Sequence, residues 1–284
     1  MLTLAGSLAF GAVLALPSQH SGRLVKVYGD LATADRVAIV VPGADTTVAT
    51  FEASTKRPGG AARALLAEAA KVGHGERLAV VAWLGYEAPP TWSLDAITDA
   101  TAIEGAKALR RTVTELHART SAPIALLCHS YGSVVCAKAG PDLPVADMAL
   151  FGSPGIDAPS NRTLSKPTRL DRTPSDRTPS DRTLPNPLPS DPTLPNATPS
   201  DPTPSATRVW AGVGGGDWIR FVPKVKLGPL GFGADALSPG YGARLFEVGP
   251  GGHSDYFAPG TPSLRNLTLI ALGRPGDVVA AAPA

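Results

Sequence analysis

A serine, an aspartate and a histidine occur in that order along the chain, each in a loop that follows an apolar segment. Ser130, Asp217 and His253 come after residues 124–127, 208–211 and 244–248 respectively. A serine hydroxyl is a weak nucleophile at neutral pH, so it needs a histidine to accept its proton. A carboxylate then fixes the tautomer of that histidine and stabilises its charged form. The three residue types in this order predict covalent acyl transfer, with Ser130 as nucleophile, Asp217 as acid and His253 as base.

The acid has a second candidate. Asp157 follows the first apolar segment after Ser130, whereas Asp217 follows the next one, which is the commoner position for the acid. We prefer Asp217 and expect Asp157 to be a turn or capping residue. Asp235 and Asp255 are expected to be loop residues that at most support the site.

The base is selected by its position in the chain. His253 lies in a glycine-rich loop after the last predicted strand, which leaves the imidazole room to reach a serine. His129 adjoins Ser130, and we expect its side chain to point away from the serine and to be structural. The remaining histidines follow no such strand: His20, His74 and His117.

The segment around Ser130 predicts a sharp turn from a strand into a helix. Residues 124–127 form an apolar run, and 132–139 have the composition of a helix that Ser133 would begin. Such a turn brings backbone atoms close together and needs small residues. Gly132 supplies one two residues after the serine, and Cys128 stands at the matching position before it. Cys128 and Cys136 are expected to be buried thiols rather than a disulfide.

Acyl transfer also needs hydrogen-bond donors for the negative charge that develops on the substrate oxygen. The backbone N–H of Tyr131, directly after the nucleophile, is the first predicted donor. The second is expected from the loop after the apolar run 37–41, where Gly43 permits a close approach and Ala44 or Asp45 offers an N–H. We place it on Ala44.

The remaining pattern predicts the elements that position these loops. Apolar runs predict strands, and longer segments with an apolar side predict helices. The second long helix would place Ile103, Leu109, Val113 and Leu116 on its apolar side. Alternating strands and helices indicate an α/β fold with a mostly parallel sheet covered by helices on both faces. The predicted strands are 24–28, 37–41, 78–83, 124–127, 148–151, 208–211 and 244–248, and the predicted helices are 61–72, 95–119 (or 99–119), 132–139 and 263–272.

A proline-rich insertion interrupts this pattern at residues 160–206. Within it, residues 171–205 repeat every five residues, with recurring proline and few apolar side chains. Such a composition predicts disorder and a linker role, because no apolar face offsets the entropy of ordering. The chain therefore divides into an apolar segment at 1–21, a domain in two parts at 22–159 and 207–274, the insertion between them, and a tail at 275–284.

Composition limits the partners and the compartment. The net charge is +2, which does not indicate nucleic-acid binding, and histidine and cysteine never recur at the spacing of metal ligands. The uncharged residues 1–16 have the length of a signal-peptide core but no preceding lysine or arginine. The protein is expected to be either cytoplasmic or exported by an atypical signal, with membrane contact only if this segment is an anchor.

Several motifs together resemble a bacterial α/β-hydrolase family that has long been catalogued as a domain of unknown function. They are CHSYGS, VPG, WLGYEAP, GSPG, the Asp217-Trp218-Ile219 segment, GYGARLF and GGHSDY, spread over residues 22–273 outside the insertion. The resemblance implies an α/β-hydrolase fold with Ser130 as nucleophile, Asp217 as acid and His253 as base. The sequence departs from the family at Cys128, where glycine is usual.

These observations predict a serine hydrolase that cleaves an ester, thioester or amide of a small molecule through an acyl-enzyme, without a cofactor or metal. Esters are preferred because the loops hold Tyr86, Trp92 and Trp218 and show no charged specificity pocket. The alternative is a catalytically weak or inactive member of the fold that binds a ligand or a protein. The distance from Ser130 Oγ to His253 distinguishes the two.

Overall fold

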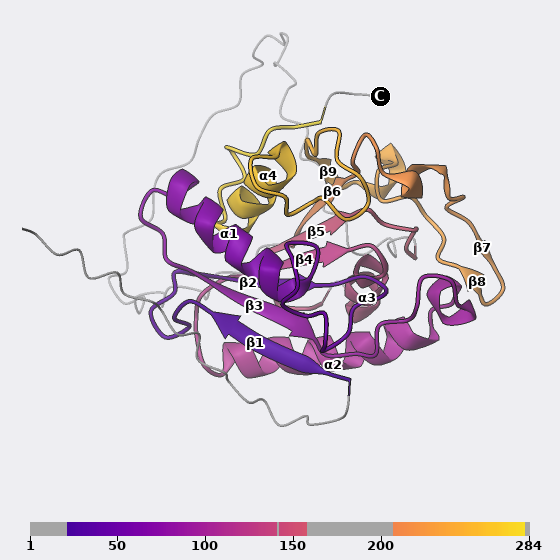
Figure 1. The fold of residues 1–284 in the computed structure, drawn as a ribbon, viewed down its shortest axis with the longest axis horizontal. Coiled ribbons are helices and arrows are strands. Elements are labelled where there is room, and N and C mark those ends of the chain that lie inside the picture. Colours follow the sequence, from indigo (N-terminus) through magenta and orange to yellow (C-terminus); the bar gives the residue numbers. More distant parts are fainter. Residues whose placement is uncertain (1–21, 141, 158–206, 282–284) are drawn as a thin grey trace, which may run out of the picture.

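The computed structural model describes residues 22–140, 142–157 and 207–281, so the apolar segment 1–21 and the proline-rich insertion lie outside the described residues. One seven-stranded sheet forms the centre of the domain (Figure 1). β1 pairs antiparallel with β3, and every other pair in this sheet is parallel, which confirms the predicted mostly parallel sheet. In spatial order the strands are β1(Leu24–Tyr28), β3(Leu78–Leu84), β2(Arg36–Val41), β4(Ile124–His129), β5(Asp147–Phe151), β6(Arg208–Gly212) and β9(Arg244–Leu245).

Helices cover both faces of the sheet (Figure 1). One face carries α1(Pro58–Val72) and α4(Pro262–Ala271), and the other carries α2(Ala100–His117) and α3(Tyr131–Ala139). Neighbouring strand residues therefore serve two separate cores: Ile39 packs toward α2 and α3, whereas Val40 packs toward α1 and α4. This double burial explains why the central strands are almost continuously apolar.

Several boundaries and one side chain differ from the sequence prediction. α1 begins at Pro58 rather than at residue 61, and α2 spans Ala100–His117 rather than 95–119 or 99–119. β9 ends at Leu245, because residues 246 and 247 turn to pair with residues 279 and 280. α3 begins at Tyr131, before Ser133. Ile103 is 40% exposed, because the buried stripe of α2 runs through Ala102 and Ala106 to Leu109, Val113 and Leu116. None of the described helices is both long and apolar enough to cross a membrane.

The cysteines form a disulfide, so the expectation of two buried thiols is wrong. Cys128 at the end of β4 is bonded to Cys136 in α3, eight residues later, and both side chains are fully buried. The chain reverses between these elements at Ser130, which brings the end of the strand beside the second turn of the helix. A local apolar composition does not reveal this contact, because the two positions become neighbours only after the turn has formed.

Candidate active site

Ser130 lies on a backbone turn that most side chains avoid. Its φ of 52° and ψ of −125° are strained for a residue other than glycine. Flanking backbone hydrogen bonds hold it there: its N–H donates to Phe151 O at 2.9 Å, and Ser133 N–H donates to Ser130 O at 2.9 Å. A Cβ on Gly132 would lie 2.6 Å from the carbonyl oxygen of Pro42, so a larger residue could not bring α3 this close to the end of β2.

Three loops at the carboxyl ends of parallel strands bring the predicted triad residues together. His253 Nε2 lies 2.8 Å from Ser130 Oγ, and His253 Nδ1 lies 2.9 Å from Asp217 Oδ1 and 3.0 Å from Oδ2. A carboxylate only accepts, so Nδ1 carries the proton in this arrangement and Nε2 is free to accept the serine proton. The contacts match the geometry required for an activated serine.

The Asp217 carboxylate is fully buried and well supplied with donors. Ile219 N–H donates to Oδ1 at 2.8 Å, and the Tyr256 hydroxyl donates to Oδ2. Burial alone would raise the pKa of Asp217, but the hydrogen bonds from His253, Tyr256 and Ile219 together lower it. The carboxylate therefore stays ionised and orients His253.

Tyr256 is a supporting residue that sequence reasoning missed. Besides donating to Asp217, its hydroxyl accepts a hydrogen bond from Gly214 N–H at 3.2 Å. Burial and the hydrogen bond to Asp217 raise the pKa of the Tyr256 phenol, so it remains a donor at neutral pH. The sequence shows only that Tyr256 lies three residues after His253. It does not show that the ring turns back toward Asp217.

His129 lies beside the site without contacting the serine oxygen. Its Nε2 lies 2.6 Å from the backbone carbonyl of His253, so Nε2 carries the proton, and its ring packs against Phe151 and Tyr256. Burial, followed by the charge of nearby His253, lowers the pKa of His129 to about 3. His129 is thus neutral and holds the loop that carries His253.

The loop after β2 comes directly against the nucleophile. A Cβ on Gly43 would lie 2.6 Å from Ser130 Cβ, so glycine is needed at this approach. Asp45 N–H donates to Pro89 O at 3.0 Å and is already used, whereas Ala44 N–H has no backbone acceptor within the parts of the chain that are described. Tyr131 N–H is at the first position of α3, where a helix leaves it unpaired. Neither of the two predicted donors therefore has a backbone acceptor among the described residues.

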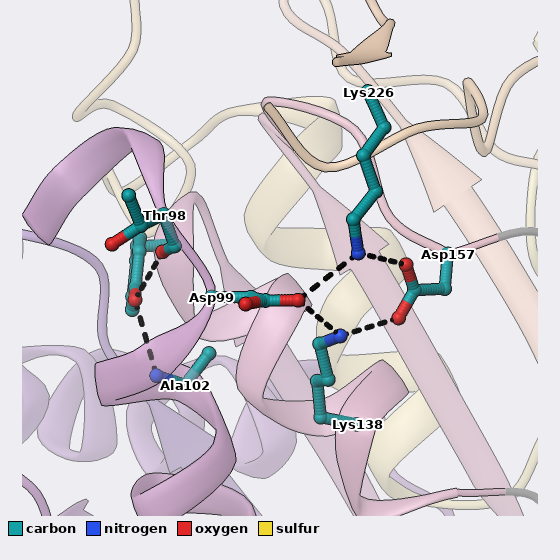
Figure 2. A network of polar contacts seen from close by, with 7 residues as sticks. Thr98, Asp99, Ala102, Lys138, Asp157 and Lys226 are labelled. Carbon is teal, nitrogen blue, oxygen red and sulfur yellow. Dashed lines mark hydrogen bonds and ion pairs between the residues drawn. The ribbon is translucent and has the colours of Figure 1, made fainter. Parts of the chain in front are cut away.

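Asp157, the rival acid, points into a separate cluster of charges (Figure 2). Lys138 Nζ lies 2.6 Å from both Asp157 Oδ2 and Asp99 Oδ2, and Lys226 Nζ lies 3.0 Å from an oxygen of each. These hydrogen bonds lower the pKa of Asp157 against the opposing effect of its burial. Asp235 accepts from Leu237 N–H, so among the aspartates considered Asp217 is the one that contacts His253.

The charge cluster also fixes a hairpin that sequence reasoning did not predict. Lys226 belongs to β7(Lys226–Leu227), which pairs with β8(Leu230–Gly231). Leu230 bridges to Thr98 at the start of α2, beside Asp99. Two lysines and two aspartates from four separate segments therefore hold this hairpin against the domain, next to the apolar pocket that opens on Ser130.

That apolar pocket has a volume of about 280 Å³. Ser130, His253 and Ala44 are among its lining residues, and the rest of its lining is mostly apolar. Trp92 and Trp218, expected from the sequence to meet the substrate, line it and remain exposed to solvent at 95% and 46%. Its other apolar lining residues are Ala96, Ile97, Pro154, Ile219, Val222, Pro223 and Phe232.

The third aromatic side chain expected at the substrate, Tyr86, is instead part of the core. It is 1% exposed, its hydroxyl donates to Pro42 O at 2.7 Å, and its ring stacks on Tyr131. The loop composition could not show this, because Tyr86 reaches inward under α2. Tyr86 supports the loop that presents Ala44.

A second pocket of about 330 Å³ shares Ser130 and His253 with the first. Its lining is polar and carries Lys56 and Arg57, so the expectation that no charged specificity pocket exists is wrong. Neither cation is adjacent in sequence to a predicted triad residue, so the sequence alone does not predict this pocket. Among the described residues, no group of three or more His, Cys, Asp or Glu side chains is placed to hold a metal ion.

Comparison with known proteins identifies relatives of this chain. A model of the alpha/beta hydrolase family matches residues 17–175, a range that contains Ser130 but ends before Asp217 and His253. An uncharacterized protein of Mycobacterium tuberculosis and one of Mycobacterium bovis are each 34% identical over 136 residues, which are 45% of this chain and 51% of theirs. The chain thus matches about half the length of these relatives.

Solved structures with a similar arrangement share little sequence with this chain. Esterase PE8 is 14% identical with a TM-score of 0.44, over 86% of this chain and 95% of its own. An α/β serine hydrolase without a lid, from Xanthomonas campestris, is 14% identical with a TM-score of 0.42, over 92% of this chain and 91% of its own.

Proposed function

This chain belongs to the alpha/beta hydrolase family, and from that premise we propose that it is a serine hydrolase that cleaves carboxylic esters through an acyl-enzyme on Ser130. One observation carries the proposal. His253 Nε2 lies 2.8 Å from Ser130 Oγ while His253 Nδ1 is bound to the buried Asp217 carboxylate.

The proposed reaction begins when Ser130 Oγ attacks the ester carbonyl carbon and His253 Nε2 takes the serine proton. The carbonyl oxygen becomes negatively charged and accepts hydrogen bonds from Tyr131 N–H and Ala44 N–H. His253 then gives its proton to the leaving alcohol as the C–O bond breaks, which leaves the acyl group on Ser130. A water molecule, deprotonated by His253, then attacks the acyl carbon. The bond from this carbon to Ser130 Oγ breaks, His253 returns the proton to Oγ, and the carboxylic acid leaves.

The pockets support a small-molecule ester as substrate. The apolar pocket of about 280 Å³ fits a short hydrocarbon or aromatic group beside the scissile bond. Trp92 and Trp218 line this pocket, and their exposed rings are available to pack against an apolar group of a small molecule.

A fluorophosphonate probe tests the proposal, because it reacts with activated serines. Wild type should be labelled on Ser130, and Ser130→Ala should not be labelled although it unfolds at the same temperature. Absence of labelling on folded wild type would contradict the proposal. It would favour the alternative of a binding protein, for which His253 need not act on Ser130.

A further inference from the structure

The two pockets that meet at Ser130 differ in chemistry. Ala44, Thr91, Ser130 and His253 line both of them, so a molecule whose ester bond lies at Ser130 can extend into each. One side is lined mostly by apolar side chains. The other is lined by hydroxyl groups and two cations: Thr46, Thr50, Ser54, Thr91, Ser254, Lys56 and Arg57.

Arg57 is the cation that is available for a ligand. Its Nη1 donates to Asp45 O at 2.6 Å and to Thr46 Oγ1 at 3.3 Å. Across the ranges that the structure describes, no carboxylate forms an ion pair with this guanidinium. Lys56 differs, because its Nζ lies 3.4 Å from Asp255 Oδ1. Arg57 thus has donors left over in a pocket that opens on the nucleophile.

Asp45 also lines this pocket, but its carboxylate does not form an ion pair with Arg57 among the described contacts. The Asp45 carboxylate accepts from Thr91 N–H at 2.9 Å and from the Thr91 hydroxyl. It is therefore already supplied with donors and directed toward the loop at residue 91. Because the lining holds Lys56 and Arg57 against the single carboxylate of Asp45, it carries a net positive charge.

We propose that the substrate is an ester with an anionic group, a carboxylate or a phosphate, on one side of the scissile bond and an apolar group on the other. Arg57 binds the anionic group and determines this specificity, and the apolar group fills the pocket under Trp92 and Trp218. The inference rests on the proposed function, since it assigns a substrate class to the same serine. A guanidinium matches both anions because its donors are arranged in a fork.

Two pairs of esters test the inference, each pair differing only in charge. The first pair, 4-(butanoyloxy)benzoate and 4-(butanoyloxy)benzamide, places the charge on the alcohol side. The second pair, mono-4-nitrophenyl glutarate and its terminal amide, places the charge on the acyl side. Wild type should prefer the charged member of at least one pair by about tenfold in kcat/KM, the scale of a charge-assisted hydrogen bond. The preference should shrink as the salt concentration rises, because salt screens the attraction between Arg57 and the anionic group.

The variants separate recognition of charge from support of the loop. Arg57→Gln should remove the preference within the pair, even if loss of the contact to Asp45 O lowers turnover of both members. Arg57→Lys should keep part of the preference for the charged ester. Lys107→Gln, a change at an exposed residue of α2 that lines neither pocket, controls for net charge and should leave the preference unchanged.

A binding experiment keeps this test independent of catalysis. Calorimetry with Ser130→Ala measures the affinity of the corresponding amides, 4-(butanoylamino)benzoate, 4-(butanoylamino)benzamide and the matching glutaranilides. Hydrolysis of both members of each pair at equal rates would overturn the anion site and leave the proposed function standing. Arg57-dependent binding of a charged amide, with no hydrolysis by wild type, would support the anion site and overturn the proposed function. Equal binding with no hydrolysis would overturn both.

Discussion

At the scale of single residues, Asp217 is the carboxylate on which the proposed chemistry depends. It accepts hydrogen bonds from His253, Ile219 and Tyr256 in a fully buried position. Asp217→Asn should lower kcat by about ten-thousand-fold, because an amide no longer holds His253 in the reactive tautomer. Steady-state kinetics with a neutral butyrate ester measures the loss, and KM should change little.

Asp157→Asn is the matched control for Asp217→Asn. Asp157 contacts Lys138 and Lys226 and not His253, so its amide variant should show a far smaller loss of kcat. Both variants must unfold at the temperature of wild type for the comparison to report on catalysis. If Asp157→Asn abolished turnover and Asp217→Asn retained it, the acid would have to be reassigned, while Ser130 and His253 would keep their proposed roles.

His129 predicts a specific dependence of stability on pH. Its pKa is about 3 in the folded protein and 6.5 for an ordinary histidine, so below pH 6.5 the unfolded chain binds a proton that the folded one does not. The free energy of unfolding should therefore fall with decreasing pH between about 6.5 and 3, by on the order of 1 kcal/mol per pH unit from this residue. The effect is absent above pH 6.5.

Urea unfolding of wild type and His129→Gln at a series of pH values measures this contribution. The glutamine amide can still donate to the carbonyl of His253 but does not titrate. Carboxylates such as Asp217 also lose their stabilising effect in acid, and they do so equally in both proteins. The difference between the two curves should grow as the pH falls from 6.5. Parallel curves would show that His129 is protonated in the folded state.

At the scale of elements, the disulfide closes a short loop around the nucleophile. Cys128 and Cys136 are eight residues apart, and the bond ties the end of β4 to α3. Replacing both by alanine should lower the free energy of unfolding by about 2–3 kcal/mol, because the unfolded chain regains the freedom that this loop restricts. Urea unfolding with and without dithiothreitol measures this loss in the free energy of unfolding. The reductant should affect only wild type.

A thiol titration of denatured protein supplies the control for the disulfide. Wild type should show no free thiol before reduction and two after it, because the chain has two cysteines. Two free thiols in unreduced protein, together with equal unfolding curves for wild type and the double variant, would contradict the bond.

The elements themselves were largely predictable because each depends on a local pattern. The buried runs of β2, β3 and β4 are continuous in sequence, and α2 has a regular apolar stripe. What the sequence did not predict depends on contacts between distant segments. The β7–β8 hairpin is held by Lys226 through Asp99 and Asp157, which are far away along the chain. The cationic pocket likewise forms only when the loop before α1 reaches the end of β4.

At the scale of the whole molecule, the site is assembled from both parts of the interrupted domain. Ser130 comes from the part before the insertion, and Asp217 and His253 come from the part after it. β5 and β6 join the two parts as parallel neighbours, with Asp147 opposite Arg208. The two side chains form an ion pair at 2.6 Å, and Asp147 is 1% exposed. The sheet itself therefore aligns the halves of the site.

This arrangement predicts that most of the insertion is dispensable. Deleting residues 171–205 leaves the fourteen residues 158–170 and 206 between the described parts. Extended, they span about 46 Å, whereas the connection must run back along a strand of about 17 Å. The contact of Thr207 Oγ1 with Val145 O and the ion pair of Arg208 with Asp147 are also retained. The deletion should leave the thermal midpoint and the hydrolysis of a butyrate ester nearly unchanged.

A variant that replaces residues 171–205 by a glycine–serine segment of equal length completes the test of the insertion. If the deletion lowered the thermal midpoint and the replacement did not, the remaining connection would be too short for the path from β5 to β6. If both variants kept the midpoint but lost turnover, the repeat would act on the active site as a cover or a substrate contact. Equal midpoints and equal turnover in all three proteins are expected, because the contacts that align β6 with β5 lie wholly within the described residues on either side.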